Sequence, residues 1–263
     1  GNNILWDFNK ELEFAILREQ LVYRMIDDVY IGFFIPDMQK DSRELIESLR
    51  KMAQDESKKM YLGIMTYEMA QNVESLFPNT FKISFDRDHS DYLYQVQDMA
   101  QLKGKKFHRK KNHLNSFMKN YEFVYEKIEA SNIEECRKMK NRWLEEKEEK
   151  TESMLLEAGA VDVALDHYQE FDFLGGLIRI DGVVEAFTFG ERLNQDTFLI
   201  HVEKASDRFR GLYTAISQQF ALYELAEYTF VNREEDMGIE GLRQSKLSFY
   251  PIEIYDKYYA YEI

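Results

Sequence analysis

With 263 residues, of which 44% are hydrophobic and 14% aromatic, the chain is long enough to bury a substantial core, as one large domain or as two modules. Its formal net charge of −14 excludes a protein that coats nucleic acid generally, because that charge repels a polyanion. The single cysteine, Cys136, excludes an intrachain disulfide. No run of sequence approaches the ~18 apolar residues of a membrane span, so we expect a soluble, cytoplasmic protein.

The first half of the chain alternates between helical and extended patterns. Leu45, Ile46 and Leu49 recur at the spacing of a helix that buries one face. In chain order, the predicted elements are a strand-sized apolar run at 30–35, a helix at 42–53, a strand at 60–66, a helix at 68–77, a strand at 81–86, and a helix or a bent pair of helices from about 94 to 120.

The second half gives a clearer pattern. Asp181 and Gly182 stand between two alternating apolar runs, which is a strong hairpin signal. In chain order, the predicted elements are a strand at 121–128, an amphipathic helix at 132–149, the hairpin at 175–193, a strand at 196–205, a helix at 210–226, a strand at 228–234, a short helix, and a closing strand at 252–263. This order predicts an α+β fold with an antiparallel front and a parallel strand pair joined through a helix.

Charged residues directly follow the last internal strand that we predict. If that strand is central, both sheet faces are covered, and the charges must pair with one another or line a cavity. Arg243 and Lys246 lie three residues apart, so they are neighbours on one face of the next helix. We expect these two cations and Arg233 to meet Glu234 and Asp236. Such a network is either a site with perturbed pKa values or a structural latch.

His201 and Glu203 lie two residues apart on a predicted strand. Strand alternation places them next to each other on one sheet face, opposite Phe198 and Val202. Such neighbours can orient an imidazole or share a proton, as acid–base catalysis requires. The alternative is a hydrogen-bonded pair that supports the adjacent strand.

A basic segment stands out in this acidic chain, because "KGKKFHRKK" at 103–111 holds six Lys and Arg residues in nine positions. On a helix, an apolar stripe of Phe107, Leu114 and Met118 would dock on the core beside a basic arc. The arc comprises Lys105, Lys106, Arg109, Lys110 and His113. It is either a solvated helix face or a surface that contacts phosphates of a tRNA or of an anionic lipid.

Several segments together resemble a known family. They are "KGKKFHRKKNHLNSF" at 103–117, "VVEAFTFGERL" at 183–193, "HVEKA" at 201–205, "FRGLYTAISQQFA" at 209–221 and "NREEDMGIEGLRQSKLSFYP" at 232–251. With the element order, they are similar to the GNAT acyltransferase fold, and more narrowly to the C-terminal domain of phosphatidylglycerol lysyltransferases (the DUF2156 group), relatives of Fem-type aminoacyl-tRNA-dependent ligases.

This resemblance covers nearly the whole chain. It implies an α+β fold of two tandem GNAT-like modules (the acyl-CoA N-acyltransferase fold), which we place at 1–125 and 126–263. It also implies transfer of an aminoacyl group from a charged tRNA to a lipid, peptide or small-molecule acceptor, without an acyl-enzyme intermediate.

One departure from the GNAT pattern concerns the acyl donor. GNAT enzymes that use acetyl-CoA carry an Arg/Gln-x-x-Gly-x-Gly/Ala turn, whose backbone N–H groups hold the pyrophosphate at a helix N-terminus. In the matching segment 208–213, Gly211 is present, but Tyr213 occupies the last, small position. A phenol ring there crowds a pyrophosphate, which favours another donor. A plain helix start is the alternative.

The transferase hypothesis assigns site residues to three groups. The candidate catalytic residues are His201, Glu203, Glu234 and Asp236. The candidate substrate-binding residues are Lys204, Tyr213, Asn232, Arg233, Arg243 and Lys246. The candidate residues for tRNA or phosphate are Lys105, Lys106, Arg109, Lys110 and His113. No metal-ligand spacing is found, and the charged tRNA is the expected donor in place of acetyl-CoA.

Two other functions remain open. A CoA-dependent N-acyltransferase predicts a gain in heat stability with acetyl-CoA. A non-catalytic relative that binds a small polar ligand predicts that Glu234→Ala and Arg243→Ala weaken binding with no turnover.

Overall fold

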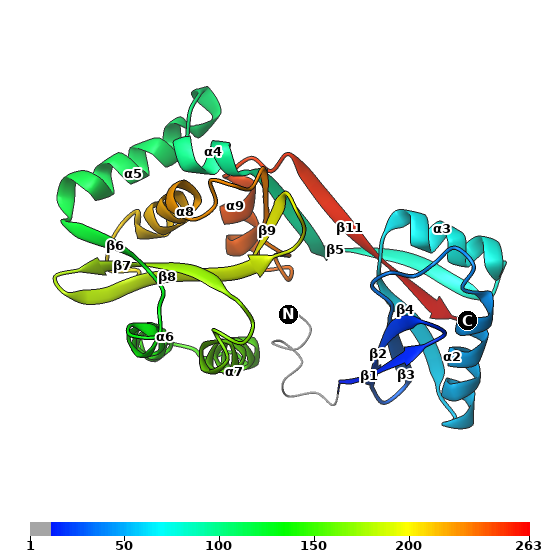
Figure 1. Cartoon of the computed structure of the whole chain (residues 1–263). Helices are drawn as coiled ribbons and strands as arrows, with labels where there is room; N and C mark the ends of the chain where they lie inside the picture. Colours follow the sequence, from blue (N-terminus) through cyan, green and yellow to red (C-terminus); the bar gives the residue numbers. More distant parts are fainter. Residues whose placement is uncertain (1–11) are drawn as a thin grey trace. The chain divides into compact units, whose positions relative to one another are not determined.

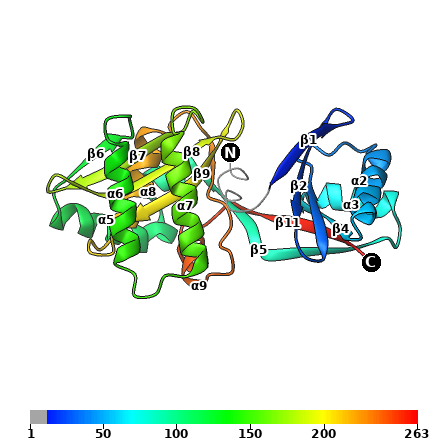
Figure 2. The same cartoon turned by 90° about the horizontal axis from the view of Figure 1, so that it is seen from below.

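The computed structural model describes residues 12–263, which form two compact units (Figures 1 and 2). Unit 1 comprises Tyr92–Glu234 and Ile239–Ile254, and the described part of unit 2 comprises residues 12–91, 235–238 and 255–263. These bounds differ from a division at residue 125, because residues 92–125 pack with the C-terminal elements of unit 1.

Unit 2 is a mixed sheet with two helices. Its elements are β1 (Glu13–Leu17), β2 (Gln20–Ile26), β3 (Tyr30–Phe34), α2 (Arg43–Asp55), β4 (Lys59–Met65), α3 (Tyr67–Leu76), most of β5 (Phe81–Gln95) and most of β11 (Glu253–Glu262). The predicted stripe of α2 is confirmed, since Leu45, Ile46 and Leu49 are buried against β3 and β4.

Unit 1 holds the remaining elements. They are α4 (Val96–Gln101), the 3₁₀ helix η1 (Lys105–Phe107), α5 (His108–Asn120), β6 (Phe123–Lys127), α6 (Ile133–Glu145), α7 (Glu152–Asp166), β7 (Leu174–Ile180), β8 (Val183–Arg192), β9 (Thr197–Ala205), α8 (Leu212–Tyr223), β10 (Phe230–Asn232) and α9 (Glu240–Leu247). The strand order of the whole sheet is β1-β2-β3-β4-β11-β5-β10-β9-β8-β7-β6.

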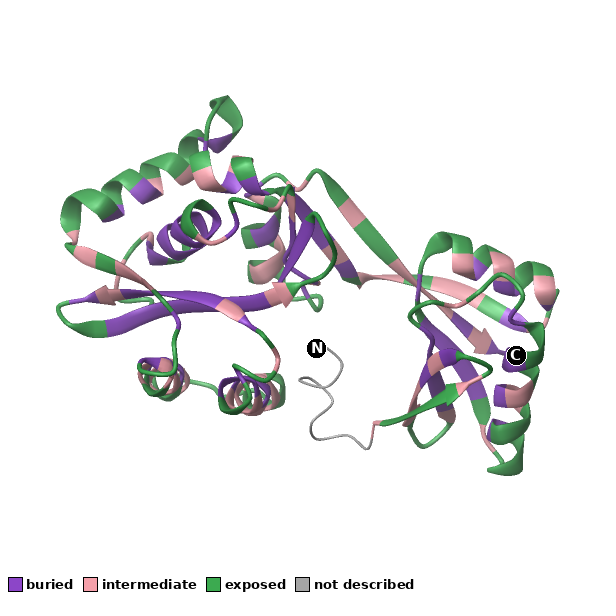
Figure 3. Ribbon diagram, in the orientation of Figure 1, coloured by how far each residue is buried: buried purple, intermediate pink, exposed green. Residues whose placement is uncertain are grey.

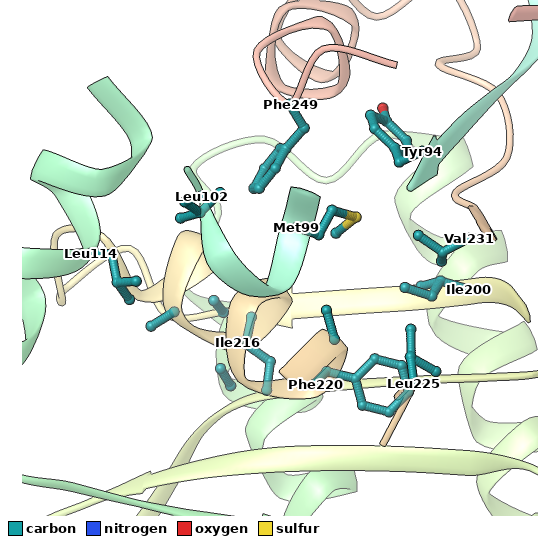
Figure 4. Packing of buried hydrophobic residues seen from close by; sticks show 14 of the residues in the cluster. Tyr94, Met99, Leu102, Leu114, Ile200, Ile216, Phe220, Leu225, Val231 and Phe249 are labelled. Carbon is teal, nitrogen blue, oxygen red and sulfur yellow. The ribbon is translucent and has the colours of Figure 1, made fainter. Parts of the chain in front are cut away.

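Helices cover both faces of the sheet in unit 1. In both views, α6 and α7 lie on one face of β7, β8 and β9, and α8 lies on the other, with α4 and α5 beyond it (Figures 1 and 2). The α8 side contains a cluster with Ile200, Ile216, Phe220 and Phe249 (Figure 4). The α6/α7 side contains a second cluster. The strands between them are therefore buried along most of their length (Figure 3).

The predicted parallel pair is confirmed: β9 and β10 are parallel neighbours joined through α8. The predicted pair of helices from about 94 to 120 is confirmed by α4 and α5, which η1 separates, although residues 94 and 95 still belong to β5. Helix α7 was not predicted, because its apolar residues are spread around the helix without forming a stripe.

A β-bulge interrupts the pairing of β8 with β9. Phe189 lies opposite Val202 and Gly190 opposite Ile200, so β9 carries one extra residue, His201. Gly190 is required at this position, because a Cβ atom there would lie 1.8 Å from the carbonyl oxygen of Leu199.

We therefore expect Gly190→Ala to lower the free energy of unfolding by about 3 kcal/mol, because the clash is with backbone. The control is Gly241→Ala in α9, where an added Cβ has no neighbour within 4 Å, and which should leave stability equal or higher by about 0.5–1 kcal/mol. Denaturant unfolding measures both. Equal effects of the two substitutions would contradict this account of the bulge.

Candidate functional site

The candidate site lies where β9 and β10 part. These parallel strands pair at three positions, through Asn232 opposite Leu199, and β10 then ends. β9 continues to Ala205. Charged side chains on this free part of β9 meet the chain that follows β10, so charges do pair inside the fold, but Arg233 meets Glu203 instead of the predicted Glu234.

The bulge separates the two candidate acid–base residues of β9. His201 packs edge-on against Phe173 of the cluster on the α6/α7 side, with ring centroids 5.6 Å apart. Glu203 accepts a hydrogen bond from Ser217 of α8, on the opposite side. The prediction that His201 and Glu203 share a face is therefore wrong, because the extra residue shifts the alternation of the strand.

His201 is held between two carboxylates. Its Nδ1 lies 2.8 Å from Oε1 of Glu234, and its Nε2 lies 2.9 Å from Oε1 of Glu191. Burial alone would lower the pKa of this imidazole, but the hydrogen bonds to the two carboxylates outweigh burial and raise its pKa to about 9. The hydrogen bond from His201 in turn lowers the pKa of Glu191. At neutral pH His201 is therefore a buried imidazolium, which cannot accept a further proton.

A second ion pair crosses the same gap on the α8 side. Nη2 of Arg233 donates to Oε1 of Glu203 over 2.9 Å, and the hydroxyl of Ser217 donates to Oε2 of Glu203 over 2.8 Å. The guanidinium also lies against the rings of Tyr94 and Phe249, at 5.7 and 4.9 Å from their centroids. Within residues 12–263, Nη1 of Arg233 is buried and has no hydrogen-bond partner. We call Glu203, Ser217 and Arg233 the Arg233 network.

Lys246 forms a latch between α9 and the end of β10. Its ammonium donates to the backbone carbonyls of Arg233 and Glu234, and its own carbonyl accepts a hydrogen bond from the hydroxyl of Tyr94. Asn232 supports the same turn by accepting a hydrogen bond from the N–H of Glu234, whose φ is +55°. α9 is thereby fixed to the end of β10.

The predicted network has two further members, Asp236 and Arg243. Asp236 belongs to unit 2, where it is fully buried, lies 3.5 Å from Arg87 and accepts a hydrogen bond from the N–H of Gly238. Arg243 is partly buried on α9. A meeting of Asp236 with Lys246 stays a prediction.

Two further candidate residues lie near the α6/α7 side. Lys204 is buried, pairs with Glu157 at 2.5 Å, and stands 3.9 Å above the ring of Trp143. Burial lowers the pKa of Lys204. Tyr213 is about one third exposed, and desolvation of its hydroxyl raises its pKa to about 12. Tyr213 touches the Arg233 network through its backbone, because its carbonyl accepts a hydrogen bond from the hydroxyl of Ser217 at 2.9 Å.

The predicted basic helix contributes to a pocket of about 340 Å³ between α5 and α9, which we call the basic pocket. Its lining residues are Lys106, Arg109, Lys110, His113, Gly241, Gln244, Ser245, Ser248 and Tyr250. Lys105, also predicted, lies outside it. The predicted stripe is partly wrong: Met118 is exposed, while Phe117 is buried beside Leu114.

The basic pocket adjoins the Arg233 network through one ring. Nζ of Lys110 lies 3.9 Å from the centroid of Phe249, which Arg233 also contacts. Burial, followed by repulsion from Arg233, lowers the pKa of Lys110 to about 8. Burial and the neighbouring cations also lower the pKa of His113, which is therefore neutral at pH 7.

Sequence reasoning missed four residues of this site, namely Tyr94, Glu191, Ser217 and Phe249. Each lies on a different element and enters the site only through tertiary packing. One signal in the sequence could have pointed to Ser217. It is followed by two glutamines inside the apolar run of α8, and polar residues in such a run need polar partners inside the fold. Among residues 12–263, no group of three His, Cys, Asp or Glu residues could hold a metal ion.

The pKa of His201 predicts a pH dependence of stability. Because its folded value of about 9 exceeds the ordinary value of 6.5, the stabilisation is complete below pH 6.5 and is lost as the pH rises through 9. The loss should approach about 3 kcal/mol. Unfolding free energies at pH 6.5 and pH 9 measure it, with His201→Gln as the control that removes this part of the loss. An unchanged pH profile in that variant would contradict the account in which Glu191 and Glu234 hold His201 as an imidazolium.

Comparison with solved structures supports the fold. A conserved protein of unknown function from Bacteroides thetaiotaomicron VPI-5482 is 32% identical, with a TM-score of 0.93 over all of this chain and 92% of that one. The C-terminal domain of a protein described as a lysylphosphatidylglycerol synthetase, from Agrobacterium fabrum, is 15% identical, with a TM-score of 0.70 over 100% and 88% of the two chains. FemX is 10% identical, with a TM-score of 0.66 over 98% of this chain and 90% of that one.

These likenesses, with a tandem GNAT protein from the clavulanic acid pathway (10% identical, TM-score 0.51 over 92% and 78%), confirm the α+β fold of two tandem GNAT-like modules. In no helix among residues 12–263 is the apolar stretch long enough to cross a membrane.

Comparison of sequences supports the family. An uncharacterized protein of Mycoplasmoides gallisepticum is 24% identical over 177 residues, which are 64% of this chain and only 55% of that protein's own length. The family described as "Phosphatidylglycerol lysyltransferase, C-terminal" matches residues 1–261. The chain therefore belongs to the family of phosphatidylglycerol lysyltransferase C-terminal domains.

Proposed function

We propose that the chain is an aminoacyl transferase, which moves an aminoacyl group from a charged tRNA to a hydroxyl or amine of a lipid, peptide or small-molecule acceptor. Membership of the lysyltransferase C-terminal family supports the class of reaction. The observation that carries the proposal is the Arg233 network, because it holds a carboxylate and an unsatisfied guanidinium N–H together next to a basic pocket.

In this proposal Glu203 accepts the proton of the attacking amine or hydroxyl. The new C–N or C–O bond forms at the ester carbonyl, whose oxygen becomes an oxyanion. Nη1 of Arg233 is the donor for that oxyanion. The bond between the carbonyl carbon and the ribose oxygen then breaks, and that oxygen takes the proton from Glu203 to become a hydroxyl. Cys136 takes no part, because it is fully buried and burial raises the pKa of its thiol to about 12.

His201 and Glu234 position this machinery rather than exchange protons with the substrate. Each already forms a strong charged hydrogen bond with the other, and Glu191 occupies the second nitrogen of His201. By fixing Glu234, His201 also fixes the backbone of Arg233 next to it.

The contacts of the segment 208–213 support a donor other than acetyl-CoA. Nη2 of Arg208, which begins the segment, donates to both oxygens of the buried Glu185, at 2.8 Å each. Its Nε is bound to Ser206. A pyrophosphate at this helix start would compete with these bonds and with the ring of Tyr213.

The test is an assay of acyl loss from a mixture of radiolabelled aminoacyl-tRNAs, with lipid, peptide and amine acceptors, corrected for spontaneous hydrolysis. We expect transfer to at least one acceptor, and a fall in rate of about 10²–10⁴-fold in Glu203→Gln, because the proton acceptor is lost. Arg233→Gln should lower the rate by about 10²–10³-fold.

The matched control is Glu74→Gln, an exposed carboxylate of unit 2, which should leave transfer unchanged. Thermal unfolding of each variant separates lost activity from lost folding. Transfer that survives in Glu203→Gln would contradict the assigned role. A rise in melting temperature with acetyl-CoA, together with acetyl transfer, would replace this proposal by the CoA-dependent one.

A further inference from the structure

The basic pocket contains positive charge that the chain itself does not neutralise. Within the described residues, Lys106 is paired with Asp98 at 2.8 Å, but neither Arg109 nor Lys110 forms an ion pair. The chain has 48 acidic and 34 basic residues, so carboxylates are in excess elsewhere. An unneutralised pair of cations in such a chain indicates a site for an anion.

A buried donor beyond Lys110, outside the lining of the pocket, also lacks an acceptor. Lys110 and Arg233 both contact the ring of Phe249, and Nη1 of Arg233 is at least nine-tenths buried with no hydrogen-bond partner in the range 12–263. Repulsion between these cations contributes to the lowered pKa of Lys110. An anion that lies beside Lys110 would relieve this repulsion.

The opposite wall has a different chemistry. Tyr250 is 45% exposed, and its ring packs edge-on against the buried Phe107 at a centroid distance of 5.5 Å. Packing therefore fixes this ring while its free surface lines the pocket. Gln244, Ser245 and Ser248 add an amide and two hydroxyl groups. An aromatic surface with amide and hydroxyl groups nearby suits a nucleobase.

We propose that the basic pocket binds one nucleotide of an RNA, with its phosphate at Arg109 and Lys110 and its base against Tyr250. This inference rests on the proposed function, in which the donor is a charged tRNA. A pocket of about 340 Å³ is of the size that holds one small ligand. An anionic lipid headgroup would use the cations but leave the aromatic wall without a role.

The position of the pocket gives the nucleotide a role in the reaction. Lys110 connects the pocket to the Arg233 network through Phe249, so a nucleotide bound there places the RNA beside Glu203. Binding energy from a part of the donor that does not react is thereby used to position the ester.

The test is calorimetric titration of the whole chain with AMP, inorganic phosphate and adenosine, and with vesicles that contain phosphatidylglycerol. We expect AMP to bind more tightly than phosphate or adenosine. Lys110→Met should weaken AMP binding tenfold or more, and Tyr250→Leu should weaken AMP but not phosphate. Lys105→Met is the control, because it removes an adjacent cation that lies outside the pocket, and it should leave AMP binding unchanged.

The pH dependence gives an independent readout. The groups that face Lys110 are Arg109 and His113 on α5, Glu203 on β9, and Arg233 after β10. AMP binding should be strongest below pH 8 and weaken above it as Lys110 loses its proton, and Lys110→Met should remove this step.

Several outcomes would overturn the inference. They are no AMP binding at millimolar concentration, equal binding in Lys110→Met with its folding confirmed by thermal unfolding, or binding of vesicles through the same residues in place of AMP. Transfer activity without AMP binding would remove this inference and leave the proposed function. AMP binding without transfer would remove the proposed function and leave the nucleotide site.

Discussion

The end of β10 imposes one constraint on the whole of unit 1: charged residues must remain inside the fold where two parallel strands part. The structure meets it with two ion pairs that cross the gap, His201 with Glu234 on the α6/α7 side and Glu203 with Arg233 on the α8 side. A buried charge without a partner destabilises the fold, because it loses its hydration, and an opposite charge with hydrogen bonds offsets that loss. The β-bulge at His201 makes the arrangement possible, because it turns His201 and Glu203, which regular alternation would place on one face, to opposite faces.

The remaining parts of the site follow from these pairs. Lys246 binds the carbonyl groups of Arg233 and Glu234 just after β10, and so holds α9 in place. With α9 fixed, Phe249 is brought against both Arg233 and Lys110, and α5 and α9 enclose the basic pocket. A carboxylate, a buried guanidinium and the basic pocket are thus coupled by packing, which is the arrangement that the proposed transfer needs.

The sequence predicted the fold better than the site. Asp181-Gly182, the alternating runs on either side of it and the helical pattern at 210–226 gave the right topology because they are local signals. The burial of Arg233, Glu234 and Lys246 followed from their place after a central strand. Their partners could not be predicted, because a one-residue bulge is invisible to alternation. Glu191, Ser217 and Phe249 reach the site from three other places in the chain.

The most direct measurement is a double-mutant cycle on the unfolding free energy, with Glu203→Gln and Arg233→Met. If the pair bridges the parted strands, each single substitution costs about 3 kcal/mol, because it leaves a buried charge without its partner. The double variant should then be more stable than the sum of the two losses predicts, by about 2 kcal/mol. Losses that add to within about 0.5 kcal/mol would show that the two side chains do not depend on each other, and would contradict the account.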